Sequence, residues 1–469
     1  MKINSEIILK DFVTFIKTIG KISEQHLISF VFPVENFDGL KVINQLNGFY
    51  DDLFFFRIPD NKLTIIGLNS ALELASNNKK DFRSVFDNFN HWKKNHSNNW
   101  NGLNPDSVPT ICCTVKFDQS KSTPLWEDFE SLRIYIPEFI FSFKDGSVTG
   151  VFNFIFQNNK SLEEISGGLS FYLKKIEELI EKSFEKSNSK IKSTLNTGEE
   201  KVKGWNESFN KSLQLLKAGD VKKLVLSRAF GFTISSLFSW TDLLYNLFQK
   251  SKDCYLFFTK RKSSFFFGSS PEMFLKVTGN CVEVESVAGS APRGKRFEAD
   301  HQFEKLLQAS EKNNREHLFV SDFISEILIR YSDNVKIIEE KQIRKLNNIQ
   351  HLLTKISAEL NSKNKLFEMI DSLFPTPAVC GVPKESAIIS IRKLEPHDRG
   401  LYSGLIGLMN FEGECELAVS IRSALVKNNT VTAFAGAGLV KDSNSDEEFF
   451  ETNLKLNTIL SLFEYENKS

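Results

Sequence analysis

A net charge is missing from this sequence, because 59 acidic side chains balance 59 basic ones over 469 residues. The Lys and Arg residues are also spread along the whole chain rather than collected in one stretch. Proteins that bind nucleic acids or anionic membrane surfaces usually concentrate positive charge in a patch. The sequence therefore gives no sign of such partners, and we expect the protein to act on a small molecule.

Long apolar runs and paired cysteine motifs are missing as well. No stretch approaches the roughly 18–20 apolar residues of a membrane-spanning helix, and the first residues, MKINSEIILKDF, lack the apolar core of a signal peptide. The six cysteines show neither Cys-x-x-Cys nor zinc-finger spacing, which is typical of a reducing compartment. We therefore expect a cytoplasmic protein.

Apolar residues, in contrast, are plentiful. They make up 41% of the chain, enough for one large domain or two ordinary ones, and no repeat of fixed length is present. The stretches ICCTVKF, LRIYIPEFIFSF and VTGVFNFIF predict successive strands of an antiparallel meander. The polar stretch from Ser193 to Gly204 is the best candidate for a linker. It separates residues 1–200, in which we identify no chemistry, from residues 205–465.

Residues 415–438 combine an arginine with closely spaced glycines. Alternating side chains predict one strand over CELAVSIRSALV, in which small neighbours of Arg422 leave a hollow for a ligand carboxylate. An exposed strand arginine is the alternative. After a turn at residues 428–429, a second strand ends in AGAG, where Gly436 and Gly438 either let the backbone approach an anion or form a tight turn. A dinucleotide-binding fingerprint is excluded because its third glycine is missing.

A helix is predicted to begin at Ser445. Ser445 and Glu448 have the Ser-x-x-Glu spacing of a capping box, which accounts for Glu448. Glu451 lies beyond the first turn, and Lys455 follows it at i+4 on the border of an apolar face. A surface ion pair would explain this spacing, and so would a site for a hard cation if a second carboxylate reaches it.

Two further titratable residues stand in apolar surroundings. Lys223 is the second residue of KKLVLSRAF, a predicted strand with two apolar faces, where desolvation would favour a neutral amine that acts as a base. A strand-end lysine that reaches water is the alternative. Glu272 lies in a loop after the Phe265–Phe267 cluster, where an apolar wall would raise its pKa and make it a general acid, although an exposed loop glutamate is the simpler interpretation. Gly289 and Ser290 then offer a backbone N–H and a hydroxyl.

Glu316 is placed among apolar residues of a long helix predicted over residues 298–330. It shares a helical stripe with Phe319 and Val320, so its charge must be paired or bind a metal. His351 and Tyr402 are equally compatible with the core and with a site, where the phenol would add a donor beside Arg422.

Ten short motifs follow one another in the second half of the chain. They are KKLVLSRAF, SSPEMFL, VAGSAPRG, EKNNREH, IQHLLTKI, FPTPAVCGVPKESA, EPHDRGLYSG, VSIRSALV, FAGAGLV and EEFFETNLK. With these motifs in this order, the chain resembles the chorismate-utilising enzymes from about Trp205 to Phe463; the family comprises isochorismate, salicylate, anthranilate and aminodeoxychorismate synthases. The resemblance implies a single α+β domain of large antiparallel sheets packed with helices, to which residues 1–200 contribute a divergent half and residues 205–465 the catalytic half.

The resemblance also implies roles for individual residues. Glu316 and Glu451 would hold Mg²⁺, which would neutralise the ring carboxylate of chorismate. Arg422 and Tyr402, with backbone at Gly436 and Gly438, would hold the enolpyruvyl carboxylate. The pocket would be completed by Gly289, Ser290, His351 and Lys455.

The nucleophile distinguishes the members of the family. Relatives that add ammonia are similar to Gln-Val-Val-Pro-Ser-Arg at the strand where this chain has residues 223–228, and to Pro-Ala-Gly-Thr where it has residues 375–378. Ammonia needs no base, whereas water does. The resemblance thus implies a water-adding isochorismate synthase with Lys223 as base and Glu272 as acid, serving menaquinone or siderophore biosynthesis. We expect a monomer without a glutamine amidotransferase subunit.

Two alternatives remain at this point. Salicylate synthase shares the first half-reaction and adds elimination of pyruvate, and a non-catalytic chorismate-binding protein would keep only the fold. Asn313 stands where some salicylate-forming relatives have an acid, which disfavours the first. Phe374 replaces the histidine that many relatives have before Pro-Thr-Pro-Ala, at the expected rim of the pocket.

Overall fold

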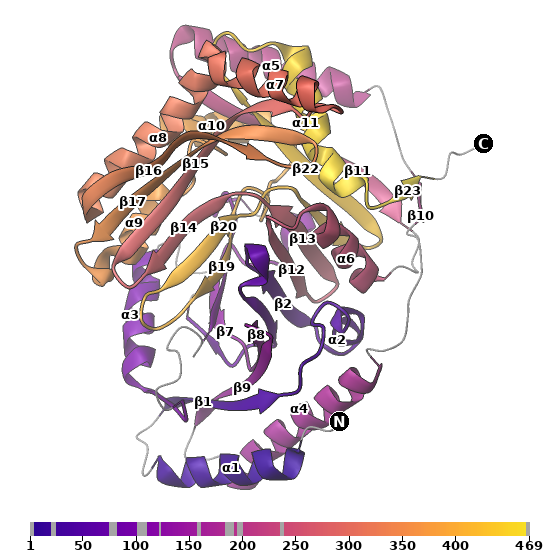
Figure 1. The fold of residues 1–469 in the computed structure, drawn as a ribbon, viewed down its shortest axis with the longest axis vertical. Coiled ribbons are helices and arrows are strands. Elements are labelled where there is room, and N and C mark those ends of the chain that lie inside the picture. Colours follow the sequence, from indigo (N-terminus) through magenta and orange to yellow (C-terminus); the bar gives the residue numbers. More distant parts are fainter. Residues whose placement is uncertain are drawn as a thin grey trace.

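Two large β-sheets form the centre of the computed structural model, and helices cover their outer faces (Figure 1). The structure describes residues 4–19, 25–74, 82–100, 110–121, 123–156, 161–182, 192–194, 200–234 and 239–465. The predicted α+β fold with antiparallel sheets is confirmed. Strand pairs are antiparallel except β1 with β5 and β10 with β23.

Strands from both halves of the sequence build each sheet. The first sheet contains, in order, β23 (Glu464–Tyr465), β10 (Lys192–Thr194), β11 (Lys223–Ile234), β22 (Thr430–Leu439), β21 (Ser423–Lys427), β13 (Ser264–Ser270), β12 (Tyr255–Arg261), β2 (Asp52–Arg57), β3 (Thr64–Leu68), β8 (Phe139–Lys144), β9 (Ser147–Phe156), β1 (His26–Val34) and β5 (His96–Asn98), with β18 (Gly381–Val382) beside β11. The second contains β16 (Ser332–Lys345), β17 (Ile349–Leu360), β15 (Cys281–Pro292), β14 (Met273–Thr278), β20 (Cys415–Val419), β19 (Leu405–Met409), β6 (Ile111–Val115), β7 (Leu132–Ile136) and β4 (Leu72–Glu73). The division near residue 200 stays a prediction.

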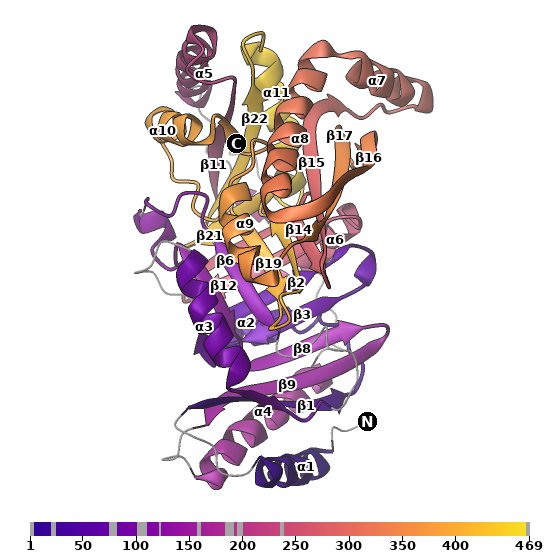
Figure 2. The ribbon, with the colours of Figure 1, turned by 90° about the vertical axis from the view of Figure 1, so that its left-hand side faces the viewer.

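The helices lie at the ends and on the outer faces of this sandwich. Figure 2 shows α1 beside α4 at one end and α7 with α8 at the other. The bounds are α1 (Ser5–Thr18), α2 (Ile43–Phe49), α3 (Phe82–Lys94), α4 (Leu162–Lys182), α5 (Glu200–Ala218), α6 (Trp240–Lys250), α7 (Phe297–Ala309), α8 (Glu311–Tyr331), α9 (Leu366–Leu373), α10 (Lys384–Leu394) and α11 (Ser445–Leu460).

Strand β2 shows how the apolar residues specify these layers. Successive side chains of a strand point to opposite faces, so a strand buried on both sides carries a continuous apolar run. Leu53 and Phe55 pack in the core beneath α1, α4, α6 and α11, whereas Phe54 and Phe56 pack between the two sheets. A third core lies between the second sheet and α3, α8 and α9.

Several expected elements are interrupted. The stretch LRIYIPEFIFSF divides into β7 and β8 in different sheets, with the break at Pro137, so the expected meander is wrong. The long helix expected over residues 298–330 is two helices, because the Ser310 side chain accepts a hydrogen bond from Asn313 N and caps α8. The linker expected over residues 193–204 includes the end of β10 and the start of α5, while residues 195–199 lie outside the described residues.

The strand expected over CELAVSIRSALV is also wrong. It divides into β20 of the second sheet and β21 of the first, and Arg422 lies at the crossing with a φ of 51°. A second crossing, through Pro271 and Glu272, joins β13 to β14. The two crossings are hydrogen bonded, since Val419 N donates to Glu272 O at 3.1 Å and Ser269 N donates to Arg422 O at 3.1 Å. Alternation within a strand cannot reveal such a change of sheet.

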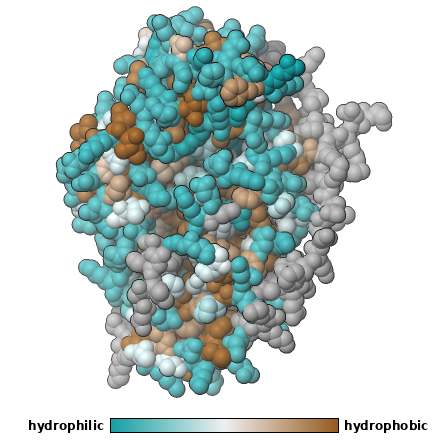
Figure 3. Space-filling model, in the orientation of Figure 1, coloured by the Kyte–Doolittle hydropathy of each residue, from teal (hydrophilic) through white to brown (hydrophobic). Residues whose placement is uncertain are grey.

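The face of the molecule in Figure 3 is mostly hydrophilic, with apolar side chains scattered over it. None of the described helices is both long and apolar enough to cross a membrane.

All six cysteines are free, and five of them are buried.

A buried ion-pair network joins the sheets in the N-terminal half. Arg133 on β7 is 2% exposed and donates to both carboxylate oxygens of Asp52 on β2, at 2.9 and 2.5 Å. It also donates to Glu73 on β4 at 2.9 Å. Removing one partner of a buried pair leaves an uncompensated charge, which costs more than the pair contributes.

Replacing Arg133 by Met should therefore destabilise the protein by about 1–3 kcal/mol, because Asp52 loses two hydrogen bonds and keeps Arg261, at 2.8 Å, as a partner. Chemical denaturation or the midpoint of thermal unfolding would measure the loss. Lys62→Met is the matched control, because it removes one partner of an exposed ion pair. The Lys62 side chain is 69% exposed, and its Nζ lies 3.6 Å from Oδ2 of Asp60. Equal stability of the two variants would show that the network does not hold the sheets together.

Candidate active site

A cavity with about 640 Å³ of space not filled by atoms, part of it open to solvent, lies where the two crossings meet β11, β15, β17, β22, α8 and α11. The structure brings together eleven of the twelve predicted site residues on its wall, and Lys223 lies directly behind one of them. The eleven are Glu272, Gly289, Ser290, Glu316, His351, Tyr402, Arg422, Gly436, Gly438, Glu451 and Lys455.

Lys223 is completely buried at the start of β11, so it does not reach water as a strand-end lysine could. Its Nζ lies 3.1 Å from Oε1 of Glu316 on α8. This distance is that of an ion pair, but the angles are unfavourable, and Nζ has no well-directed hydrogen bond to any described residue. The nitrogen is therefore held beside a carboxylate and can still donate a hydrogen bond to a further acceptor.

Gly438 makes room for this pair. A Cβ atom added at residue 438 would lie 1.9 Å from Oε1 of Glu316 and 3.1 Å from Cε of Lys223. Gly436, two residues earlier on β22, would bring a Cβ to 3.0 Å from the hydroxyl of Tyr402. The AGAG sequence lies within β22 and not in a turn, and its glycines let polar side chains approach the strand.

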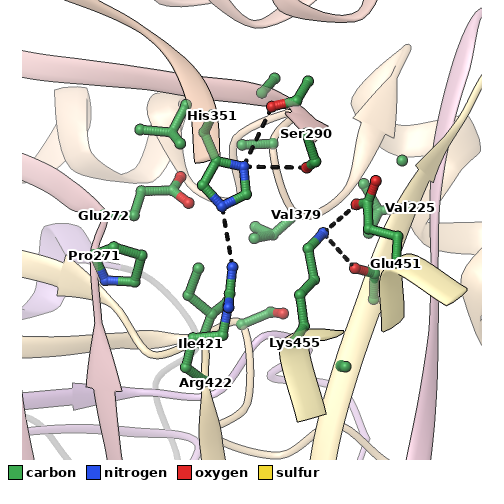
Figure 4. Close-up of a pocket in the computed structure, with 18 of the residues that line it drawn as sticks. Val225, Pro271, Glu272, Ser290, His351, Val379, Ile421, Arg422, Glu451 and Lys455 are labelled. Carbon is green, nitrogen blue, oxygen red and sulfur yellow. Dashed lines mark hydrogen bonds and ion pairs between the residues drawn. The ribbon is translucent and has the colours of Figure 1, made fainter. Parts of the chain in front are cut away.

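Helix α11 supplies the second carboxylate. Lys455 Nζ lies 2.5 Å from Glu451 Oε1 and donates to Gly436 O at 2.8 Å, which ties the helix to β22 (Figure 4). Burial raises the pKa of Glu451, but the Lys455 ammonium outweighs burial, so the pKa lies below its ordinary value. Glu451 is therefore ionised at neutral pH.

The capping box expected at the start of α11 is wrong. Asn444 caps the helix, because its side chain accepts hydrogen bonds from the backbone N–H groups of Asp446 and Glu447. Glu448 instead turns inward, is 2% exposed and pairs with Lys312 at 2.5 Å. Burial and the charge of Glu451 raise the pKa of Glu448 to about 7. Its position three residues before Glu451, on the same helical face, was the signal that could have identified it.

Arg422 and His351 form the opposite wall (Figure 4). Arg422 Nη2 lies 3.1 Å from His351 Nε2, and a guanidinium can only donate, so Nε2 accepts. The ring proton then lies on Nδ1, which is 3.2 Å from Gly289 O and 3.1 Å from Ser290 Oγ. Burial and the neighbouring Arg422 charge hold the pKa of His351 well below its usual range. The imidazole is therefore neutral, and it orients Arg422.

The backbone of Arg422 is itself unusual. A positive φ in a residue other than glycine costs on the order of 1–3 kcal/mol and is often found at functional sites. Arg422 is 6% exposed, and Tyr402 nearby has a pKa raised to about 12 by burial. Tyr402 is thus a neutral hydroxyl, and together with Arg422 it can donate hydrogen bonds to an anion.

Glu272 is buried rather than exposed, with 4% of its surface accessible. Burial, followed by the charge of Glu285, raises the pKa of Glu272 to about 8, although Lys223, Arg344 and Lys455 act in the opposite direction. The carboxyl group is therefore mostly protonated at neutral pH, as a general acid must be.

Two carboxylates on this wall are suited to a hard cation. Glu316 and Glu451 come from different helices, and the charges of both act on Glu448 and on Lys312. Within the described ranges no group of three or more His, Cys, Asp or Glu side chains is arranged to hold a metal. Mg²⁺ needs only one or two protein carboxylates when waters and a substrate complete its octahedron. The residues present fit such an ion.

Phe374 and Asn313 depart from the family pattern, and neither lines the cavity. Phe374 is buried and packs on Phe274, so it does not form the expected rim of the cavity. Asn313 on α8 accepts a hydrogen bond from Ser290 N at 3.3 Å and thereby orients the β15 backbone beside the cavity.

Comparisons with known proteins bear on the family and the fold. A family model described as chorismate binding enzyme matches residues 14–464. The isochorismate synthase MenF of Bacillus subtilis is 28% identical over 93% of both chains, and the anthranilate synthase component 1 of Saccharolobus solfataricus is 34% identical over 56% of this chain and 64% of its own. The structure of MenF, the menaquinone-specific isochorismate synthase of Escherichia coli, superposes with a TM-score of 0.76, 20% identity and coverage of 97% and 99%. The fold is therefore shared.

The raised pKa of Glu272 can be tested without a substrate. Its carboxyl should lose a proton around pH 8, several units above an ordinary glutamate, because burial disfavours the charged form. Infrared difference spectra between about pH 6 and about pH 10 would follow the protonated carboxyl band, and Glu272→Gln would identify it. A band that is already absent near pH 6 would contradict the prediction.

Proposed function

Because the chain belongs to the chorismate-binding enzyme family, whose members typically use Mg²⁺, we propose that it is an isochorismate synthase. It converts chorismate to isochorismate by adding water at C2 of the ring and losing the hydroxyl at C4. The observation that carries this proposal is a largely protonated carboxyl, Glu272, on the wall of the cavity, together with a buried lysine, Lys223, directly behind Glu316 on the same wall. Water addition needs such a base and acid, whereas ammonia addition needs no base.

The substrate orientation follows from the charges on the wall. Chorismate carries two carboxylates, and Arg422 with Tyr402 offers donors for the enolpyruvyl carboxylate. Glu316 and Glu451 would hold Mg²⁺, which when bound neutralises the ring carboxylate. Gly289, Ser290, His351, Gly436, Gly438 and Lys455 shape the remainder of the site.

The reaction then needs two proton transfers. Lys223 takes a proton from water as its oxygen bonds to C2, both ring double bonds shift by one position, and the C4–O bond breaks. Glu272 gives its proton to the departing hydroxyl, which leaves as water. One water enters and one leaves, and Lys223 and Glu272 return to their starting states by exchange with solvent. The requirement for a protonated Glu272 carboxyl predicts a limb of the pH profile along which activity falls as the pH rises through the pKa of Glu272, about 8.

All the residues proposed to act lie between Lys223 and Lys455, which supports residues 205–465 as the catalytic half. Because water is the nucleophile, we propose that the enzyme works as a monomer without a glutamine amidotransferase subunit. Isochorismate would then supply menaquinone or siderophore biosynthesis.

Incubation with chorismate and Mg²⁺, followed by separation of the products, tests the proposal. Isochorismate alone would support it. Salicylate with pyruvate would identify a salicylate synthase instead, and anthranilate formed when ammonium is added would identify an ammonia-using enzyme. Recovery of unchanged chorismate would leave a binding protein.

EDTA should abolish turnover and Mg²⁺ should restore it, because the ring carboxylate would otherwise face Glu316 and Glu451 without a cation. Glu451→Gln should not be rescued at ordinary Mg²⁺ concentrations. Glu447→Gln is the control, because Glu447 is exposed on the same helix. Full activity of the Glu451 variant, or turnover that is undiminished in EDTA, would remove the metal from the mechanism.

Lys223→Ala should lower the rate of isochorismate formation by roughly 10²–10⁴-fold, the usual contribution of general-base catalysis. Lys222→Ala is the matched control, because Lys222 is the exposed neighbour. Lys223→Gln should also be assayed with ammonium, since a nucleophile that needs no base could then replace water. If Lys223→Ala is folded and turns over at nearly the wild-type rate, Lys223 is a structural residue and the mechanism is wrong.

A further inference from the structure

Residues 270–273 form the segment that carries Glu272, and polar contacts hold this segment in place. Within it, Ser270 Oγ donates to Val419 O at 2.6 Å, and Glu272 N donates to Ser270 Oγ at 3.2 Å. Val419 N donates back to Glu272 O at 3.1 Å. These contacts tie the segment to the neighbouring crossing, but none comes from a charged side chain.

Two charged side chains hold the same segment from the second sheet. Arg344 on β16 donates to Pro271 O at 2.6 Å, and Glu285 on β15 accepts from Met273 N at 3.3 Å. Arg344 also donates to both oxygens of Glu285, at 2.6 and 2.7 Å. The ion pair therefore forms hydrogen bonds with the backbone immediately before and immediately after Glu272.

This ion pair is more deeply buried than a surface pair, with 6% exposure of the Glu285 side chain and 21% of that of Arg344. Planar, bidentate pairing fixes both groups in one geometry, so a backbone that binds to both is fixed as well. Neither residue lines the cavity, and the proposed reaction uses neither.

We infer that Glu285 and Arg344 are positioning residues for Glu272, which fix the segment carrying the proposed acid and place one negative and one positive charge behind it. The inference rests on the proposed function in that Glu272 is taken as the acid. It goes beyond that function because it assigns control of the acid to an ion pair outside the cavity.

The charges around Glu272 come from several elements. Besides burial, the charge of Glu285 on β15 raises its pKa, whereas Lys223 on β11, Arg344 on β16 and Lys455 on α11 lower it. Arg422 faces Glu272 from the neighbouring crossing, and His351 on β17 is neutral. Glu285 is thus the acidic neighbour, and Arg344 is the basic one that touches the segment itself.

The two halves of the pair should therefore act with opposite sign. Glu285→Gln keeps the shape and an acceptor for Met273 N but removes the negative charge, so the limb of the pH profile that belongs to Glu272 should move to lower pH by roughly half a unit to one unit. Arg344→Gln removes the positive charge, so the same limb should move to higher pH by a similar amount. In both variants the rate at the new optimum should stay within about tenfold of the wild-type rate, since Glu272 is retained.

Glu416→Gln is the matched control. Glu416 lies on the adjacent region of the second sheet, and its carboxylate binds the Tyr255 hydroxyl at 2.8 Å and Lys276 at 3.2 Å instead of the segment. The pH profile of Glu416→Gln should have its limbs at the same pH values as the profile of the wild type. A purely structural role of the pair would lower activity at every pH without opposite shifts.

The infrared band of Glu272 separates failure of this inference from failure of the proposed function. If no isochorismate forms, the band should still titrate at lower pH in Glu285→Gln and at higher pH in Arg344→Gln. Unshifted limbs and an unshifted band in both folded variants, or shifts of the same sign, would overturn the inference. Should one variant fail to fold, the shift of the other, compared with Glu416→Gln, decides the matter.

Discussion

The arrangement of the site depends on two neighbouring crossings of the chain from one sheet to the other. At each crossing the ladder hydrogen bonds of a strand end, and the free backbone groups are satisfied by the other crossing, through Glu272 O with Val419 N and Arg422 O with Ser269 N. The proposed acid and the proposed anion-binding arginine thus occupy the seam between the sheets. Moving either crossing would displace both side chains, because each supplies hydrogen bonds to the other.

Burial of charge is the second constraint. Lys223 with Glu316 joins β11 to α8, Lys312 with Glu448 joins α8 to α11, and Lys455 with Glu451 lies within α11. Lys223 and Glu448 are buried, and the other four side chains of these pairs are partly buried. A buried charge without a partner is costly, so these groups hold one another in place. The glycines of β22 provide the space, because a Cβ at residue 438 would overlap Glu316. A cluster so rich in carboxylates and amines is suited to a charged substrate and a cation.

The acid and its surroundings show how one fold can keep a carboxyl protonated beside ionised ones. Glu272 is buried and has Glu285 as a neighbour, so its pKa is raised to about 8, whereas the pKa of Glu451 is lowered by its contact with Lys455. When the surroundings of two carboxyl groups give them different pKa values, one group can donate a proton while the other stays ionised. The same cavity therefore contains a protonated carboxyl and an ionised carboxylate.

The sequence by itself determined the elements whose patterns are local, and through its ordered motifs the family. The strand β11 over KKLVLSRAF, the turn at residues 428–429 between β21 and β22, and the start of α11 at Ser445 follow from apolar residues, turn residues and helix periodicity within a few positions. Only the tertiary structure decided where strands change sheets, as at Pro137 and Arg422, because alternation looks the same on either sheet. It also decided that Asn444 caps α11 and that Glu448 turns inward, since a cap and a buried ion pair compete for the same side chains. Glu285 and Arg344 lie 13 and 72 positions after Glu272 in the sequence and hydrogen bond to the residues on either side of it. No local pattern predicts such a contact.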